Sequence, residues 1–247
     1  MKIIKIPFSG GSLGKNIGCE SAPDEITKLL NIEPINLDVR NKNMEETGRV
    51  VYEFVKSYND KLFLIGGDHS LTYYSFKAFA EKNKDCGLVV FDAHPDMQGS
   101  DFVTHEDYLR ILVESSLIRT SNLVLIGVRS ISKEELEYLL EKRIIYFDMG
   151  KIYEFGVREI CDLIMEKMSN FSKFYLSIDI DVVDPAFAPG TGYLEPGGIS
   201  SSDLLYFLNR VKNMKNLGIV DLVEINPNKD VNNITVKLGS KIVEVFL

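Results

Sequence analysis

Short apolar runs alternate with longer amphipathic stretches along the whole chain. The apolar runs predict strands at residues 2–8, 33–39, 61–67, 87–94, 122–128, 143–149, 174–182 and 217–225. Runs that are apolar at almost every position are typical of strands buried on both faces of a parallel sheet. The stretches between them predict helices at residues 22–31, 44–58, 70–83, 105–117, 132–143, 157–170 and 200–214, and a last helix within 232–247.

Several of these helices have start signals. Ser70 directly follows an apolar run, SKEE at 132–135 has the pattern of a capping box, and SSD at 201–203 offers N-cap side chains. Because strands and helices alternate, we expect an α/β protein in which helices cover both faces of a parallel sheet. Residues 183–199 contain no clear element, and long loops of this kind are often functional.

Composition and charge argue against several classes of function. The 247 residues are enough to bury a sizeable core, and a net charge of −8 disfavours a nucleic-acid partner held by its phosphates. No apolar run is long enough to span a bilayer. Cys19, Cys86 and Cys161 are odd in number and widely spaced. This pattern is typical of a protein of the reducing cytoplasm and argues against disulfides or thiolate ligands.

Polar residues that are costly to bury stand where four of the predicted strands end. They are His69; Asp92, His94 and Asp96; Asp179 and Asp181; and Glu224. In a parallel sheet the carboxyl ends of the strands lie along one edge, where ligands usually bind. We therefore expect these side chains to converge on one crevice.

The spacing of these residues indicates a metal centre. Residues two apart in an extended segment point the same way, so Asp92, His94 and Asp96 should face one side, as should Asp179 and Asp181. Four carboxylates pressed together could not all stay ionised without cations. Two divalent metals would neutralise them. Oxygen-rich ligation with imidazole and no thiolate suits Mn²⁺ and, less selectively, Fe²⁺, Co²⁺ or Zn²⁺.

At these residues the sequence resembles the ureohydrolase family, which includes arginase and agmatinase. The resemblance rests on GGDHS (66–70), DAHPD (92–96), SIDIDVVDPAFAPGTGYLEPGG (177–198), VEINP (223–227) and the N-terminal IPFSGGSLGKNIGCESAPDEI (6–26). It spans nearly the whole chain. It implies a single domain over residues 1–247, with a three-layer αβα fold, an eight-stranded and mostly parallel sheet, and two manganese ions.

The resemblance also implies a role for each metal-binding residue. One metal would have His69 and Asp96 as terminal ligands, and the other would have His94 and Asp181. Asp92 and Asp179 would bridge the two ions.

Three further residues match the family's substrate site. Glu224 would pair with the substrate guanidinium, and His105, in the loop after DAHPD, would shuttle protons. Tyr193 stands where the family typically has Thr-Pro, beside the guanidinium, so it bears on substrate identity.

The implied reaction is hydrolysis of a guanidinium group to urea and an amine, with a small cationic guanidine as the substrate. The loop 97–107 contains Asp101, Glu106 and Asp107 but no Lys or Arg, which favours a substrate with a second positive charge. Agmatine, which would give putrescine, fits this description best. Arginine, another guanidino acid and formimidoylglutamate stay open.

Two other classes of protein fit part of the pattern. A mononuclear metal deacetylase shares the αβα architecture and a DxH element, but would not need His69, Asp96 and Asp181 for a further metal. A metal-binding paralogue without catalysis is disfavoured by the intact ligand set and Glu224, although Tyr193 leaves room for it. By resemblance we also expect a homo-oligomer, a trimer or hexamer, in the cytoplasm.

Asp68 and Asp184 also lie within the quoted motifs. We interpret both as turn-forming or supporting acids rather than as metal ligands.

Overall fold

The computed structural model describes residues 1–39 and 43–247. Within them, eight strands form one sheet in the order β2-β1-β3-β8-β7-β4-β5-β6, and every neighbouring pair is parallel. The strands are β1 (Lys2–Lys5), β2 (Ile35–Asn36), β3 (Leu62–Ile65), β4 (Gly87–Phe91), β5 (Leu123–Val128), β6 (Ile145–Asp148), β7 (Phe174–Asp179) and β8 (Leu217–Val223). Each lies within a predicted apolar run.

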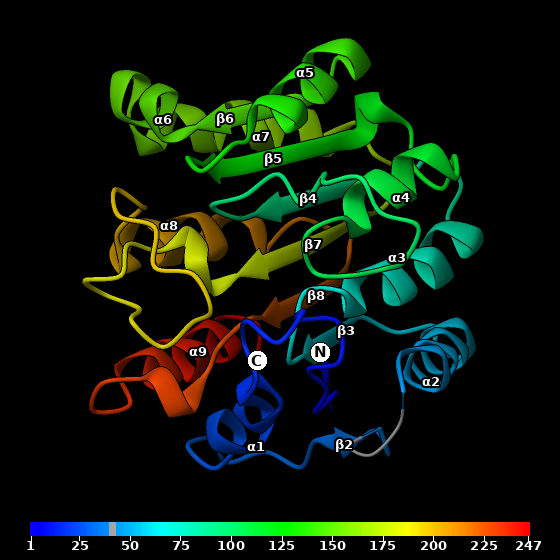
Figure 1. Ribbon diagram of the computed structural model, residues 1–247, viewed down its shortest axis with the longest axis vertical. Coiled ribbons are helices and arrows are strands. Elements are labelled where there is room, and N and C mark those ends of the chain that lie inside the picture. Colours follow the sequence, from blue (N-terminus) through cyan, green and yellow to red (C-terminus); the bar gives the residue numbers. More distant parts are fainter. Residues whose placement is uncertain (40–42) are drawn as a thin grey trace.

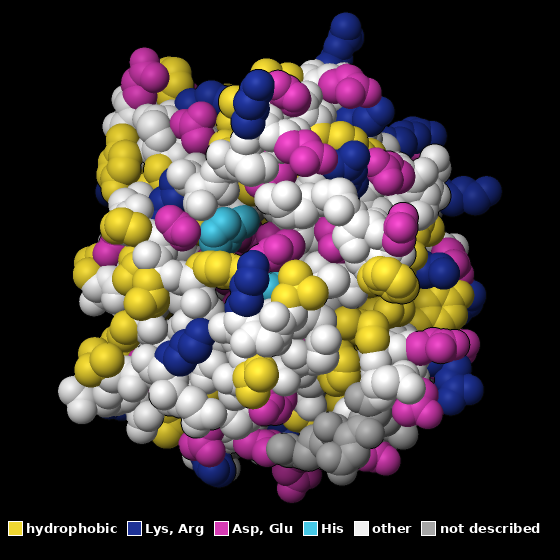
Figure 2. Space-filling view, in the orientation of Figure 1, with side chains coloured by type: hydrophobic (Ala, Val, Ile, Leu, Met, Phe, Trp, Pro, Cys, Tyr) yellow, Lys and Arg dark blue, Asp and Glu magenta, His cyan; other side chains and the backbone are white. Residues whose placement is uncertain are grey.

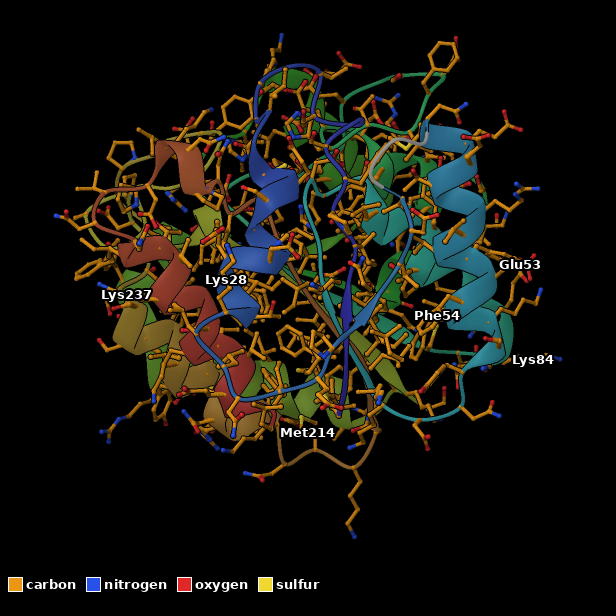
Figure 3. The ribbon with its side chains drawn as sticks, turned by 90° about the horizontal axis from the view of Figure 1, so that it is seen from below. Lys28, Glu53, Phe54, Lys84, Met214 and Lys237 are labelled. Atoms are coloured by element: carbon orange, nitrogen blue, oxygen red, sulfur yellow. The ribbon has the colours of Figure 1, made fainter. Side chains whose placement is uncertain are left out.

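Helices cover both faces of this sheet (Figure 1). One face packs against α1 (Ala22–Thr27), α6 (Met149–Phe155), α7 (Val157–Ser169), α8 (Ser201–Val211) and α9 (Ile234–Val245). The other packs against α2 (Met44–Ser57), α3 (Leu71–Lys82), α4 (Tyr108–Glu114) and α5 (Lys133–Lys142). Figure 3 shows the sheet between α9, which carries Lys237, and α2, which carries Glu53. The expected three-layer αβα arrangement is confirmed.

The apolar strands divide their side chains between two cores. In β4, Val89 and Phe91 enter one core, whereas Leu88 and Val90 enter the other. Full burial of an aliphatic or aromatic side chain stabilises a fold by roughly 1.5–3 kcal/mol, so both faces contribute to stability. This two-sided burial explains why the strands lack the polar alternation of a half-exposed sheet. None of the described helices is both long and apolar enough to cross a membrane.

The helix starts agree with the sequence in part. Ser132 and Glu135 form the predicted capping box before α5. The N-cap of α8 is Ser200, which accepts a hydrogen bond from Asp203 N, rather than a residue of 201–203. Ser70 precedes α3 but does not cap it, because its hydroxyl binds Asp68 instead.

The short helix α6 was not predicted. It begins directly after β6, where Asp148 accepts a hydrogen bond from Lys151 N at 2.8 Å. Its first residue, Met149, continues the apolar run of the strand, so the run concealed the boundary. The loop 183–199 forms no helix or named strand, as expected, and Asp184 organises it by accepting from the amides of Ala186, Gly197 and Gly198.

The strand order places β3, β8, β7 and β4 side by side in the middle of the sheet. These are the four strands whose ends were predicted to supply polar side chains. Their carboxyl ends therefore form a continuous platform. The N-terminal loop reaches this platform closely, because the amide of Asp68 donates to the carbonyl of Phe8 at 3.1 Å.

The close approach at Gly67 gives a stability prediction. A Cβ at Gly67 would lie 1.7 Å from the carbonyl oxygen of Phe8, so the backbone has to shift. We expect Gly67→Ala to lower the free energy of unfolding by about 1–3 kcal/mol, measured from the midpoint of urea unfolding. Gly150→Ala is the control, because its Cβ would meet only the Asp148 carboxylate, at 3.2 Å. A wild-type midpoint for Gly67→Ala would contradict the prediction.

Candidate metal centre

The predicted ligands meet at the carboxyl ends of the four central strands. Asp179 is the last residue of β7, Asp92 directly follows β4, and His69 lies between β3 and α3. Five of the six are buried, and His94 is partly exposed; the six are His69, Asp92, His94, Asp96, Asp179 and Asp181. The sequence therefore identified which side chains converge.

The reason given for that convergence was wrong in part. Asp92, His94 and Asp96 follow the end of β4, so they do not alternate along an extended strand. The chain turns instead: the amide of His94 donates to Asp92 Oδ1 at 2.6 Å, and Asp96 has a left-handed φ of 51°. Asp181 lies in a 3₁₀ turn, and the amide of Asp181 donates to Asp179 Oδ1 at 2.8 Å. Aspartate side chains often fix such turns by binding a backbone amide two residues on.

Two groups of ligand atoms result, and they share one carboxylate. His69 Nδ1 lies 3.1 Å from Asp92 Oδ2 and 3.2 Å from both Asp96 Oδ2 and Asp179 Oδ2. His69, Asp92 and Asp179 thus form one candidate metal group. Asp92, His94 and Asp181 form the second, with His94 Nδ1 at 3.0 Å from Asp181 Oδ2.

The hydrogen bonds around His69 fix which of its nitrogens faces the carboxylates. Nε2 lies 2.8 Å from the hydroxyl of Ser177 and 2.9 Å from that of Tyr108. Ser177 donates its own proton to Asp221 Oδ1 at 2.6 Å, so it accepts one from Nε2. A neutral imidazole then has its lone pair on Nδ1. An outer hydrogen bond that orients a histidine in this way is typical of metal ligands.

Two buried atoms of the predicted ligands have no hydrogen-bond partner within the described residues. They are Nδ1 of His69 and Oδ2 of Asp92, which face each other at 3.1 Å. Buried polar atoms are nearly always satisfied, so these two fit the ligand atoms of a bound cation. The donor set consists of carboxylate oxygens and imidazole nitrogens, and it fits a divalent metal.

The electrostatics of the metal-free site agree with this interpretation. Burial raises the pKa of Asp96 well above its usual range, and the charge of Asp92 raises it further. Burial, together with Asp181 and Asp92, has the same effect on the pKa of Asp179. Burial also opposes ionisation of Asp92, but the neighbouring imidazoles of His69 and His94 lower its pKa. The four carboxyl groups are therefore not all ionised together unless positive charge is added.

Glu224 lies beside the metal ligands in a strained conformation, with a φ of 65°. Its Oε1 accepts from the amide of His69 at 2.7 Å and lies 3.2 Å from His105 Nδ1. Asn16 donates from Nδ2 to Oε2 at 2.6 Å. Non-glycine residues in this backbone region are uncommon and cluster at functional sites. Asn16 was not predicted, although it belongs to the N-terminal segment that supports the family resemblance.

A cavity of about 560 Å³ opens over these residues, and Glu224, His105 and Tyr193 all line it. Figure 2 shows histidine in a hollow near the middle of this face, beside acidic and basic side chains. The Tyr193 ring lies 5.9 Å from that of His105 and 5.2 Å from that of His94. Tyr193 therefore contacts the site, as its sequence position indicated.

Only one of the three acids in the loop 97–107 lines the cavity, contrary to expectation. Asp107 is buried and accepts two hydrogen bonds from Thr104, each 2.7 Å long. Asp101 is exposed and lies at a separate depression. Glu106 alone of the three acids faces the cavity, where Lys15 donates to its Oε1 at 2.6 Å. Lys15 was missed because no periodic pattern places the N-terminal loop over the sheet edge.

Comparison with known proteins identifies the class of protein that this fold and site define. The Arginase family model matches residues 1–247, so the chain belongs to the arginase family, that is, to the ureohydrolases. It is 32% identical over 231 residues to the proclavaminate amidinohydrolase of Streptomyces clavuligerus, covering 92% of this chain and 70% of the relative. It is 36% identical over 188 residues to the agmatinase of Bacillus cereus, covering 74% of this chain and 61% of that one.

The fold agrees with this assignment. The arginase structure from Bacillus subtilis superposes with a TM-score of 0.93 over 100% of this chain and 98% of that chain, at 22% identity. Members of the arginase family are hydrolases that act on guanidino or amidino groups, and the family is metal-dependent.

The contact between His105 and Glu224 gives a pH prediction. Burial opposes the charged imidazole, but the hydrogen bond with Glu224 and nearby carboxylates raise the pKa of His105 to about 9. The folded-state pKa is raised, so the stability from this contact is complete below about pH 6.5, the ordinary histidine value, and is lost as the pH rises through about 9. We expect NMR titration of the metal-free protein to show a pKa near 9 that Glu224→Gln lowers.

The matched control for this titration is Glu137→Gln, an exposed acid on α5 that faces Lys133. It should leave the titration of His105 unchanged. A wild-type His105 that titrates near pH 6.5 would contradict the geometry.

Proposed function

We propose that this chain is a dinuclear manganese hydrolase that cleaves a guanidinium group to urea and an amine. The observation that supports it most strongly is the pair of ligand groups joined by Asp92, with the buried carboxylate of Glu224 beside them. A mononuclear deacetylase needs no second group of ligands. A binding protein without catalysis needs no histidine beside Glu224.

The proposed ligands divide as the family resemblance implies. His69 and Asp96 would hold one ion, His94 and Asp181 the other, and Asp92 and Asp179 both. In the geometry, Asp92 belongs to both groups, whereas Asp179 belongs to the first. When bound there, two divalent ions would supply a nucleophile by lowering the pKa of a shared water.

Glu224 would bind and orient the substrate. A planar guanidinium donates paired, charge-assisted hydrogen bonds to a carboxylate. Asn16 and the amide of His69 hold the Glu224 carboxylate in place, so little freedom is lost when the substrate binds. Orientation of this kind converts attack on the guanidinium carbon into a positioned, nearly unimolecular step.

His105 would protonate the leaving amine. Its Nδ1 faces Glu224, while its Nε2 makes no hydrogen bond, and the side chain lines the cavity. A pKa raised to about 9 keeps the imidazole protonated at neutral pH, so a proton is available at Nε2. Transfer of that proton as the carbon–nitrogen bond breaks gives urea and the free amine.

Agmatine is the substrate we propose. Beyond the metal-binding residues and Glu224, three acids line the cavity, namely Glu106, Glu135 and Glu195, and Lys15 is the one Lys or Arg among the described lining residues. Glu106 already pairs with Lys15 at 2.6 Å. Acidic side chains therefore outnumber basic ones along the cavity wall. An ammonium at the far end of the substrate complements it better than a carboxylate does.

The metal content of the protein is the first test. We expect two Mn²⁺ per chain by elemental analysis of the reconstituted protein, because four aspartates and two histidines surround the site. Asp92→Asn should lower the content to one or fewer, since Asp92 belongs to both groups. Asp101→Asn, an exposed acid of the neighbouring loop, is the control and should bind two. A wild-type protein with at most one ion would exclude a dinuclear centre.

The second test is substrate choice, measured as urea release under matched Mn²⁺ and pH. We expect kcat/KM for agmatine to exceed that for arginine by about tenfold, which corresponds to about 1.4 kcal/mol in transition-state stabilisation. The ratio is modest because Lys15 can meet a substrate carboxylate once it leaves Glu106. Faster turnover of arginine would replace the agmatinase assignment with an arginase one. No urea from either substrate would remove the proposal.

A further inference from the structure

Three loops that are distant in sequence meet at the outer side of the cavity. Lys15 comes from the N-terminal loop, Glu106 from the loop after β4, and Tyr193 from the loop after β7. Lys15 Nζ and the hydroxyl of Tyr193 both donate to Glu106 Oε1, at 2.6 and 2.5 Å. Lys15 Nζ also lies 5.5 Å from the centre of the Tyr193 ring. We call Lys15, Glu106 and Tyr193 the outer cluster.

Hydrogen bonds hold the backbone around the outer cluster in place. Lys229 donates to the carbonyls of Lys15 and Gly192 at 2.8 and 3.4 Å, which joins two of the loops. The carbonyl of Glu106 accepts from the amide of Gln98 at 3.0 Å. Among the described residues, the side chain of Lys15 makes no hydrogen bond to the backbone and is held through its ammonium. Its head can therefore move while the loops stay in place.

The position of Glu106 relates it to the substrate site. His105 stands between two carboxylates: its Nδ1 is 3.2 Å from Glu224 Oε1, and its Nε2 is 3.9 Å from Glu106 Oε1. One imidazole ring thus separates the proposed guanidinium site from Glu106. A four-carbon chain that starts at Glu224 is long enough to pass this ring. The far end of the substrate then arrives at the outer cluster.

Lys15 carries the same charged group that is proposed for the far end of the substrate. Its side chain is an ammonium on four methylenes, as is the tail of agmatine, and it occupies the oxygen of Glu106. Burial opposes the charge of Glu106, but hydrogen bonds from Lys15 and Tyr193 lower its pKa. The Lys15 side chain is 48% exposed. Ion pairs with so exposed a partner are weak enough to exchange.

We propose that Glu106 binds a positively charged tail of the substrate and that Lys15 is the internal competitor of that tail. An ammonium tail displaces Lys15 from Glu106, and a carboxylate tail is accepted by drawing Lys15 away from Glu106. Tyr193 keeps the carboxylate of Glu106 in place during the exchange. This inference rests on the proposed hydrolysis of a guanidine and adds the residues that select its tail.

Two variants test the roles of Lys15 and Glu106 separately. Lys15→Met removes the competitor and keeps most of the side chain's length, and Glu106→Gln removes the charge of the binding partner. Each is assayed with agmatine, with 4-guanidinobutyrate, whose tail is a carboxylate alone, and with butylguanidine, whose tail is uncharged. Butylguanidine reports any change that is unrelated to tail charge.

We expect opposite effects on the two charged tails. Lys15→Met should lower KM for agmatine about three- to fivefold and raise it for 4-guanidinobutyrate by a similar factor. Glu106→Gln should raise KM for agmatine about tenfold and leave that for 4-guanidinobutyrate unchanged or lower. KM for butylguanidine should stay within about twofold of wild type in both variants, because a neutral tail gains nothing from either charge.

The controls remove equal charges close to the cavity but outside it. Lys133 and Glu137 lie on α5, are 90% and 68% exposed, and do not line the cavity. Lys133→Met and Glu137→Gln should leave all three substrates unchanged. If they shifted KM as the cavity variants do, a general electrostatic effect would replace the proposal.

Two outcomes distinguish failure of the inference from failure of the proposed function. If a variant changed KM by the same factor for all three guanidines, the outer cluster would have only a structural role. That result would overturn the inference. If no urea is released, the affinities of the same compounds for the Mn²⁺-loaded protein are measured by calorimetry instead. A tail-dependent shift in Kd would then uphold the inference while the hydrolase proposal falls. A Kd that is indifferent to tail charge would overturn the inference.

Discussion

Four carboxyl groups lie close to two imidazoles at the buried carboxyl ends of the central strands. The mutual repulsion of the four carboxylates is the constraint on which the rest of the site depends. Burial and neighbouring charge raise the pKa of Asp96 and Asp179 well above their usual range. No lysine or arginine of the described residues pairs with these aspartates. The arrangement is stable in its ionised form when cations compensate it.

The surrounding fold holds this charge in a fixed geometry. Asp221 in β8 lies opposite Ser177 in β7, and its two carboxylate oxygens accept from Ser177, Tyr175 and Thr72 at 2.6 Å each. Ser177 in turn orients His69. The parallel register therefore determines a chain of hydrogen bonds that ends at the imidazole of a proposed ligand, His69. Outer contacts of this kind are usually as important to a metal site as the ligands.

Much of this architecture could be predicted from sequence because two signals are strong. Apolar runs located the eight strands of the described residues, and polar residues at strand ends located the side chains that converge, since few other reasons exist to bury His69 or Asp92. Other features have no local signal. Lys15 and Asn16 reach the site through the path of a loop, and Asp101 and Asp107 face away because Thr104 and solvent satisfy them. Such features depend on tertiary packing, which periodicity does not report.

The most direct test of the dinuclear centre is electron paramagnetic resonance of the protein loaded with two equivalents of Mn²⁺. Two ions joined by the carboxylate of Asp92 should give an exchange-coupled spectrum at low temperature, and Asp92→Asn should abolish that coupling. A simple six-line spectrum of isolated Mn²⁺ at every loading would contradict the account.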